Sequence, residues 1–307
     1  MEEKIISEEQ LETMRHKARK RQNIAIVLTF LAFVLYVGMF YVALIEEEGM
    51  SALFVVKIVF AAAVLAFATF GLLWYIVVHR TYEKFISNYK SKYVTQVLNN
   101  IPGFEGLEYH PEGGFTWDDI RNAAVVACGE KKHFESEDQL FGEYENVKFR
   151  ISDVVTKKTV RRDDKRKVEE IFSGQVLCLF GFDDLKVSKG HIQIFEKEFL
   201  SSFSGWKAEY PIQTENEAFQ KRFQIYADDE HNAYYILTPQ RMEKIMEFAD
   251  AVEGQISLVF YNEKLFAAVR RESMFDAVMD EPVSKQTEYI LEDADFIQKA
   301  KGILIAS

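Results

Sequence analysis

Residues 24–45 of the chain are IAIVLTFLAFVLYVGMFYVALI, a run of 22 residues without a charge, and residues 58–78, IVFAAAVLAFATFGLLWYIVV, are a second run of 21. As helices rising roughly 1.5 Å per residue, each is about 32 Å long and covers a hydrocarbon core of about 30 Å. Only twelve residues separate the two runs. The pattern therefore predicts a helical hairpin through a bilayer.

A cleaved signal peptide is the competing interpretation of the first run. Its apolar stretch is longer than the usual one of about 7–15 residues, and no small-residue cleavage site follows it before the second run. Both runs are therefore expected in the mature protein. Six alanines and glycines in the second run either let the two helices approach closely or merely face lipid, and the sequence leaves this open: Ala61, Ala62, Ala63, Ala66, Ala68 and Gly71.

Basic residues flank the hairpin on one side only. The loop between the runs begins with Glu46, Glu47 and Glu48 and holds no Lys or Arg until Lys57, whose long stem can reach the headgroups. The positive-inside rule therefore predicts both termini in the cytoplasm and a short acidic loop outside. The basic residues on the inner side are Lys4, Arg15, Lys17, Arg19, Lys20 and Arg21 before the first run, and Arg80, Lys84, Lys90 and Lys92 after the second.

Residues at the inner ends of the two runs are the expected contacts with the membrane surface. Lys and Arg attract anionic headgroups, and Trp and Tyr are typical of the aromatic belt at the interface. The candidates here are Lys17, Arg19, Lys20, Arg21, Trp74, Tyr75 and Arg80.

The remainder of the chain is acidic. The whole chain has 37 basic and 48 acidic residues, of which 7 and 8 precede residue 79, so residues 79–307 carry 30 and 40 and a net charge of −10. Such a body disfavours general nucleic-acid binding, which needs a basic surface. The two cysteines, Cys128 and Cys178, have apolar neighbours and are expected as buried free thiols in a reducing compartment.

The predicted organisation has four parts: a cytoplasmic N-terminal helix over 1–23, the hairpin over 24–78, a juxtamembrane stalk helix over 79–101 and a cytoplasmic α+β domain over 102–307. Ser7 and Gln10 form a capping box for the first helix. Aromatic and aliphatic residues recur every three or four positions from Tyr82 to Ile101, which indicates an amphipathic helix.

Strands and helices are mixed in the C-terminal domain, so the fold class is α+β with a mainly antiparallel sheet and flanking helices. Expected helices cover 117–126, opened by a capping box at Thr116, 239–252 and 291–305. Expected strands cover 145–155, 170–182, 191–195, 223–228, 256–261 and 265–270.

A charged segment, KKTVRRDDKRK at residues 157–167, separates the first two expected strands. It holds seven basic and two acidic residues, and we expect it as the long tip of a hairpin. Two interpretations remain open: contact with anionic lipid, or a solvated tip whose charges prevent edge-to-edge aggregation. The basic residues are Lys157, Lys158, Arg161, Arg162, Lys165, Arg166 and Lys167.

The sequence offers no motif for chemistry. It has no phosphate-binding loop, nucleophile elbow or CxxC and HExxH metal motif, so no catalytic, cofactor-binding or metal-binding residue is assigned. The densest polar cluster, residues 228–232, is better explained as a solvated turn than as a metal site. A Cys128–His133 nucleophile has no local support.

Two aromatic stretches carry a resemblance: FQKRFQIY at 219–226 and AYYILTPQRM at 233–242, together with Phe172-Ser-Gly174 and the two apolar runs. With these features the chain resembles a family of bacterial inner-membrane proteins catalogued as a domain of unknown function. The resemblance covers most of residues 80–280 and implies a bacterial membrane protein with a cytoplasmic domain. It brings no catalytic or binding residue with it.

Three functions are then compatible with the sequence. The leading hypothesis is a non-enzymatic, membrane-anchored domain that binds, scaffolds or senses a protein partner. The alternatives are a membrane-tethered enzyme such as a hydrolase, and an accessory subunit of a membrane assembly. Converging titratable groups in a deep pocket favour the enzyme, whereas a flat exposed aromatic patch favours the binding protein.

Overall fold

The structure is a computed structural model that describes residues 6–45, 52–162, 165–182, 190–201 and 207–305. The chain divides into two compact units. The first, here called the hairpin unit, comprises Met1–Tyr93 and Ala277–Gln286, and the second, the sheet unit, comprises Val94–Asp276 and Thr287–Ser307. Lys4, the acidic loop at Glu46–Glu48 and the Asp163-Asp164 pair lie outside the described residues.

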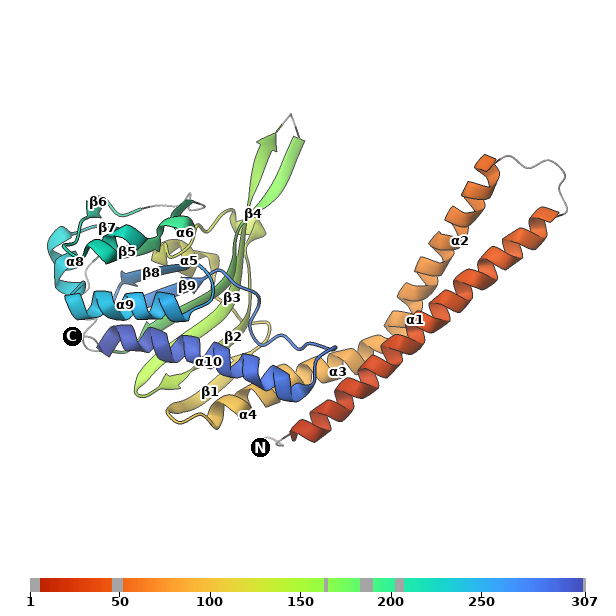
Figure 1. Ribbon diagram of the computed structural model, residues 1–307, viewed down its shortest axis with the longest axis horizontal. Coiled ribbons are helices and arrows are strands. Elements are labelled where there is room, and N and C mark those ends of the chain that lie inside the picture. Colours follow the sequence, from red (N-terminus) through yellow and green to blue (C-terminus); the bar gives the residue numbers. More distant parts are fainter. Residues whose placement is uncertain (1–5, 46–51, 163–164, 183–189, 202–206, 306–307) are drawn as a thin grey trace. The chain divides into compact units, whose positions relative to one another are not determined.

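The hairpin unit is built from helices (Figure 1). A capping box opens α1, because the Ser7 hydroxyl accepts the Gln10 N–H at 3.2 Å and the Gln10 amide oxygen accepts the Ser7 N–H at 3.3 Å. This confirms the predicted helix start, and the N-terminal helix continues without interruption into the first apolar run. The elements are α1 (Glu8–Ile45), α2 (Ala52–Leu73), the π-helical turns η1 (Trp74–His79) and η2 (Tyr89–Val94), and α3 (Arg80–Asn88) between them.

The sheet unit contains nine antiparallel strands in the order β1-β2-β3-β4-β9-β8-β5-β7-β6, which confirms the α+β class with an antiparallel sheet. All six expected strands are present, whereas β1, β2 and β6 were not predicted. The strands are β1 (Phe104–His110), β2 (Glu135–Tyr144), β3 (Val147–Arg162), β4 (Lys165–Phe180), β5 (His191–Glu196), β6 (Tyr210–Ile212), β7 (Phe223–Ala227), β8 (Ile256–Tyr261) and β9 (Lys264–Val269).

Helices cover both faces of this sheet (Figure 1). On one face, alternate side chains of β4, β8 and β9 pack against Ile120 of α5 and Phe199 of α6. On the other face, Arg241 of α9 lies over the Phe260 ring, and the Phe248 ring of α9 packs in a tilted arrangement at 5.6 Å from Phe296 of α10. The helical elements are α4 (Thr95–Asn99), α5 (Trp117–Ala123), η3 (Lys131–His133), α6 (Lys197–Ser201), α7 (Glu217–Arg222), α8 (Glu230–Ile236), α9 (Pro239–Ala251) and α10 (Val283–Ile305).

Two helix boundaries differ from the prediction. The helix opened by Thr116 ends at Ala123 and not at Val126, because Ala124 adopts a left-handed conformation with φ of 52°. The following residues are extended and held by strand side chains, for example by the Ser257 hydroxyl, which donates to the Val125 carbonyl at 2.6 Å. The C-terminal helix begins at Val283, eight residues before the expected start at 291.

The residues behind the family resemblance are structural. Phe219 and Phe223 are fully buried with ring centroids 4.7 Å apart. Thr238 caps α9, whose first residue is Pro239. Gly174 lies in β4 where a Cβ would come within 2.0 Å of the Val269 carbonyl, so only glycine fits that close strand approach.

Candidate membrane interface

Large apolar side chains of α1 and α2 face outward. Phe30 is 65% exposed, Phe60 70% and Phe67 78%. A contiguous apolar surface of this kind is unusual on a soluble protein and matches the interior of a bilayer. By length and composition, two helical stretches among the described residues can cross a membrane, Glu8–Met39 and Val59–Asn99.

The two apolar helices approach each other through small residues. Ala25 of α1 and Ala62 of α2 are completely buried, and Ala66, one turn after Ala62, is nearly so. Tyr36 and Thr69 share a hydrogen bond of 3.0 Å between their hydroxyl groups. Part of the alanine pattern therefore serves close helix packing, which resolves the alternative that the sequence left open.

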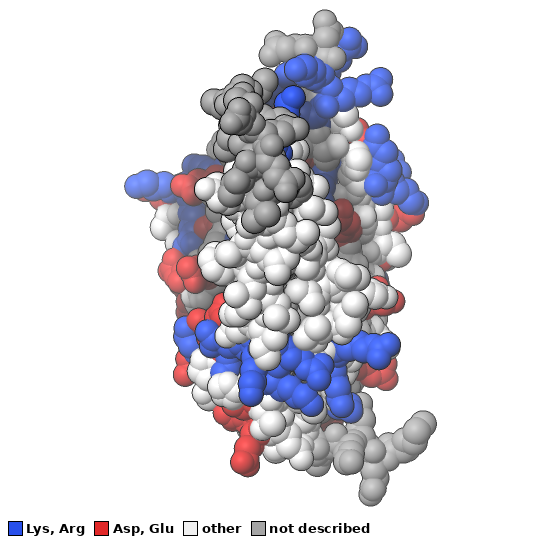
Figure 2. Space-filling view, turned by 90° about the vertical axis from the view of Figure 1, so that its right-hand side faces the viewer, with Lys and Arg blue, Asp and Glu red and all other residues white. Residues whose placement is uncertain are grey.

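A band of Lys and Arg side chains borders this apolar surface (Figure 2). Arg21 donates hydrogen bonds from Nη1 to the Thr81 hydroxyl and, at 3.5 Å, to the Val77 carbonyl, so it joins α1 to the end of the second apolar run. Lys17, Lys20 and Arg80 are exposed, and Arg19 forms a 3.2 Å ion pair with Asp280. The expected surface residues of the hairpin unit therefore lie at one level of the two helices.

The two aromatic candidates at this level differ in their exposure. The Trp74 ring packs at 5.8 Å from Phe70 and at 6.3 Å from Tyr82 and is half-buried. Tyr75 is 69% exposed and stacks on His79 at 5.7 Å. Both rings stand where the apolar run ends and charge begins, which is the position of aromatic residues at a membrane–water boundary.

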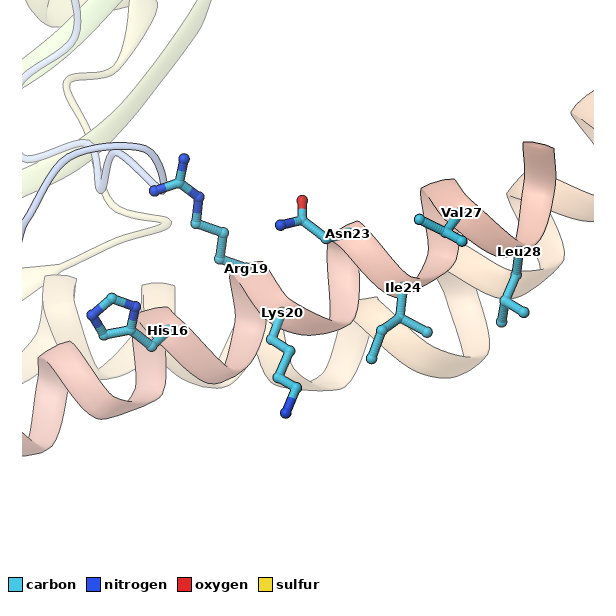
Figure 3. Close-up of a pocket in the computed structure, with 7 residues that line it drawn as sticks. All are labelled: His16, Arg19, Lys20, Asn23, Ile24, Val27 and Leu28. Atoms are coloured by element: carbon cyan, nitrogen blue, oxygen red, sulfur yellow. The ribbon is translucent and has the colours of Figure 1, made fainter. Parts of the chain in front are cut away.

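An open groove follows one side of α1 across the same level (Figure 3). Its polar end has imidazole, guanidinium, ammonium and amide groups, and its other end has only aliphatic groups. This order matches a phospholipid, which presents a charged headgroup and then an acyl chain. The lining residues are His16, Arg19, Lys20, Asn23, Ile24, Val27 and Leu28.

One N-terminal arginine is structural. Arg15 is 4% exposed, is ion-paired with Glu12 and donates from Nη1 to the Met279 carbonyl at 2.7 Å. Glu12 also accepts the Val283 N–H at 2.9 Å, and the Arg15 guanidinium holds the pKa of the Glu12 carboxyl below its usual range. Arg15 and Glu12 therefore fasten α1 to the 277–286 segment of the same unit.

The charged segment 157–167 lies at the end of the expected hairpin, but its described residues are paired strand residues and not the loop expected there. Residues 157–162 belong to β3 and residues 165–167 to β4, paired from Lys157 opposite Glu170 to Arg162 opposite Lys165. The strands continue because Thr159, Val160 and Val168 favour extended backbone and each amide gains a partner across the pair. This two-stranded extension, residues 157–170, is called the basic ribbon below.

Three buried aspartates of the sheet unit were missed by the sequence analysis. Asp153 of β3 accepts the Met274 N–H at 3.0 Å, and Asp293 of α10 accepts from Arg271 at 2.9 Å and from the Phe275 N–H at 3.4 Å. Burial raises the pKa of Asp153 to about 8 and that of Asp293 to about 6. Asp138, at the bulge of β2, accepts from the Tyr109 hydroxyl.

Asp153 and Asp293 hold the segment that follows β9, because they accept hydrogen bonds from the backbone N–H groups of Met274 and Phe275. In the sequence, burial of Asp153 is indicated only by its position as a single carboxylate within the apolar strand segment ISDVV at 151–155. Within the described residues, no group of three or more His, Cys, Asp and Glu is arranged to hold a metal ion. Their geometry supports a structural role.

The other polar candidates are also engaged. Asp228 accepts from the His191 N–H at 2.9 Å, and Asp229 caps α8 through the His231 N–H at 2.8 Å. Cys128 and Cys178 are free thiols. Cys178 is buried as expected, whereas Cys128 is only half-buried. Burial raises the pKa of the Cys178 thiol to about 12, and partial burial also raises the pKa of the Cys128 thiol. Both shifts oppose formation of a thiolate nucleophile.

Residues 170–304 match the model of a family described as a protein of unknown function, DUF3137. The match confirms the resemblance to a domain of unknown function, but its extent differs from the expected 80–280: it begins within β4 and ends within α10. No curated protein and no solved structure matches the chain.

Proposed function

We propose that the chain is a bacterial inner-membrane protein whose α1–α2 hairpin spans the bilayer and whose sheet unit lies in the cytoplasm. The observation that carries this proposal is the exposed apolar surface of the hairpin unit, bordered at one level by a band of basic side chains. Lipid satisfies that surface without further protein contacts. The resemblance to inner-membrane proteins supports the same location.

The distribution of charge supports the orientation. Lys17, Lys20 and Arg80 lie at the ends of the helices that lead toward the N-terminus and the sheet unit, whereas three glutamates follow the other end of α1. The positive-inside rule then directs both termini to the cytoplasm. The acidic sheet unit, with its two free thiols, suits that reducing compartment.

Cysteine labelling of intact cells tests this topology. In a background with Cys128→Ala and Cys178→Ala, single cysteines are introduced as Glu47→Cys in the acidic loop and Lys221→Cys on the exposed surface of α7. A membrane-impermeant maleimide is expected to label the first variant in intact cells and the second only after lysis. Labelling of Lys221→Cys from outside, or loss of the chain from membranes in an alkaline wash, would contradict the proposal.

We further propose that the sheet unit binds a protein partner and acts as a scaffold or sensor, without catalysis of its own. Three exposed tyrosines support this: Tyr210 on the terminal strand β6 and Tyr234 and Tyr235 on α8. The Tyr234 hydroxyl donates to the Gln213 carbonyl at 3.3 Å, so α8 adjoins β6. Exposed tyrosines are enriched at protein interfaces because they bury a large area at little entropic cost.

Affinity purification from native membranes tests the partner proposal. Tyr234→Ser with Tyr235→Ser is expected to release proteins that co-purify with the intact chain, whereas Lys244→Gln with Lys221→Gln on other exposed helix surfaces should retain them. An unchanged set of co-purified proteins in the tyrosine variant would remove this surface from consideration.

A further inference from the structure

The basic ribbon extends beyond the rest of the sheet (Figure 1). The last residue of β3 that pairs with β2 is Val155, and the first residue of β4 that pairs with β9 is Gln175. Residues 157–162 and 165–170 pair only with each other in the part of the chain that the structure describes. At roughly 3.3 Å per residue, this six-residue ladder is about 20 Å long.

Charge is arranged unevenly along the ribbon. At its base, Lys157 and Lys158 lie opposite Glu170 and Glu169, so the cross-strand pairs are attractive. At its end, Arg161 lies opposite Arg166 and Arg162 opposite Lys165. Like charges directly opposite each other destabilise a strand pair, and a 3.7 Å ion pair between Arg162 and Glu169 offsets only part of this repulsion.

The end of the ribbon presents cations on both faces. Cross-strand partners share a face, so Arg162, Lys165 and Lys167 lie on one side and Arg161 and Arg166 on the other. Lys165, Arg166 and Lys167 are exposed, as is Val168, at 46%. Residues 161–167 hold five cations and the two acids Asp163 and Asp164, and this excess of positive charge with one exposed aliphatic side chain suits a diffuse anionic layer better than a single shaped ligand.

The chain places such a layer within reach. Along the chain, the 15 residues 79–93 lie between the second apolar run and the start of the sheet unit, and a helix of that length is about 22 Å long. Under the proposed topology, the sheet unit that carries the ribbon is therefore permanently tethered to the inner leaflet. Tethering of this kind raises the local concentration of headgroups enough for weak contacts to form.

We propose that the end of the basic ribbon binds the phosphate headgroups of anionic lipids in the inner leaflet, as a second attachment beside the membrane-spanning hairpin. The inference rests on the proposed function, because the anchor brings the ribbon to the lipid surface. An edge-protecting role alone does not explain the like-charge pairs, since mixed charges protect an edge equally well.

A fluorescent reporter in nanodiscs tests the proposal. The full chain, with Val168→Cys in a background of Cys128→Ala and Cys178→Ala, carries an environment-sensitive fluorophore. It is reconstituted in nanodiscs of phosphatidylcholine alone or with phosphatidylglycerol. We expect a blue shift, with quenching by a headgroup-attached quencher, only in the anionic discs, and loss of both signals at high salt.

Matched charge variants sharpen this test. Lys165→Gln, Arg166→Gln and Lys167→Gln together should weaken the ribbon's lipid contact about 100-fold, as expected when each cation contributes roughly a fivefold effect at the surface. Lys148→Gln, Lys221→Gln and Lys244→Gln remove the same charge from other exposed positions of the sheet unit and should leave the signal unchanged. Equal loss in both variants would overturn the proposal.

The remaining outcomes separate the anchor from the ribbon. A reporter that does not distinguish the two discs, or that responds to free glycerophosphate or a single-stranded oligonucleotide and not to anionic discs, overturns the ribbon proposal. Failure of the chain to co-elute with either disc overturns the anchor. In that case the same discs are added in solution, and the reporter still decides whether the ribbon contacts anionic lipid.

Discussion

The hairpin unit and the sheet unit use phenylalanine in opposite ways. Phe67 in α2 is 78% exposed, whereas Phe260 in β8 is fully buried between the sheet and α9. In the sheet unit, apolar side chains are buried by other parts of the same unit. In the hairpin unit, large apolar side chains remain exposed on the surface of the described helices. Phenylalanine thus serves protein packing in the sheet unit and, under the proposed topology, lipid immersion in the hairpin unit.

The largest effect is expected when charge enters the lipid-facing surface. Leu65→Arg with Phe67→Arg should make membrane insertion less favourable by about 5–7 kcal/mol, because each central arginine costs about 2.5–3.5 kcal/mol. Fractionation of membranes and cytosol measures the outcome. Tyr234→Arg with Tyr235→Arg introduces the same charge on exposed positions of the sheet unit, and that control should stay in the membrane fraction.

Truncation of one phenylalanine in each unit gives the next largest difference. Phe260→Ala should lower the free energy of unfolding of the sheet unit by about 3–5 kcal/mol, since it leaves a cavity in a packed core. Phe67→Ala should change it by less than about 1 kcal/mol, because this side chain contributes nothing to that core. Urea unfolding of the full chain in detergent measures both, and similar losses would show that the units are not energetically distinct.

The buried carboxylates predict how stability depends on pH. Because the folded state raises the pKa of Asp153 to about 8, it binds the proton more tightly than the unfolded chain does. The contribution of Asp153 to the free energy of unfolding is therefore greatest below about pH 4. It falls by up to about 1.4 kcal/mol per pH unit as the pH rises to 8. Urea unfolding at pH 5 to 8 measures this slope.

Asp153→Asn should remove most of that slope between pH 6 and 8, since the amide still accepts the Met274 N–H but does not ionise. Asp293 contributes in the same direction, but only up to about pH 6. Asp250→Asn changes an exposed carboxylate of the same unit and should leave the slope in place. An identical pH dependence in Asp153→Asn would show that Asp153 is ionised in the folded state.

The smallest effect is expected in the basic ribbon. Arg166→Glu replaces a like-charge pair with an attractive one opposite Arg161 and should stabilise the ribbon by about 0.2–1 kcal/mol. Hydrogen exchange of the ribbon amides measures the gain. The same variant should weaken the lipid-dependent signal of the reporter at position 168, and a gain in both properties would indicate that the cations do not serve lipid contact.

The turn and cap signals were sufficient for much of the secondary structure. Thr116 and Asp119 form the predicted capping box, Pro239 begins α9, and Asn262 and Glu263 both adopt positive φ between β8 and β9. Such features depend on neighbours within a few residues, so the sequence contains them in full.

Features that depend on distant partners were not predictable. Strands β1 and β2 are rich in Glu and Gly and lack clear alternation, and they form because β3 offers a partner for their backbone groups. The sequence likewise gave no measure of how deeply Asp153 and Asp293 are buried, or that Arg21 bonds to Thr81.

By itself, the sequence determined that two segments are long and apolar enough to cross a bilayer. The length of an apolar helix follows directly from the number of consecutive apolar residues. The sequence also determined the excess of basic residues at one end of that hairpin. Only the tertiary structure decided that KKTVRRDDKRK continues two paired strands and sets arginine against arginine, since cross-strand register is fixed by hydrogen bonds between residues distant in the chain.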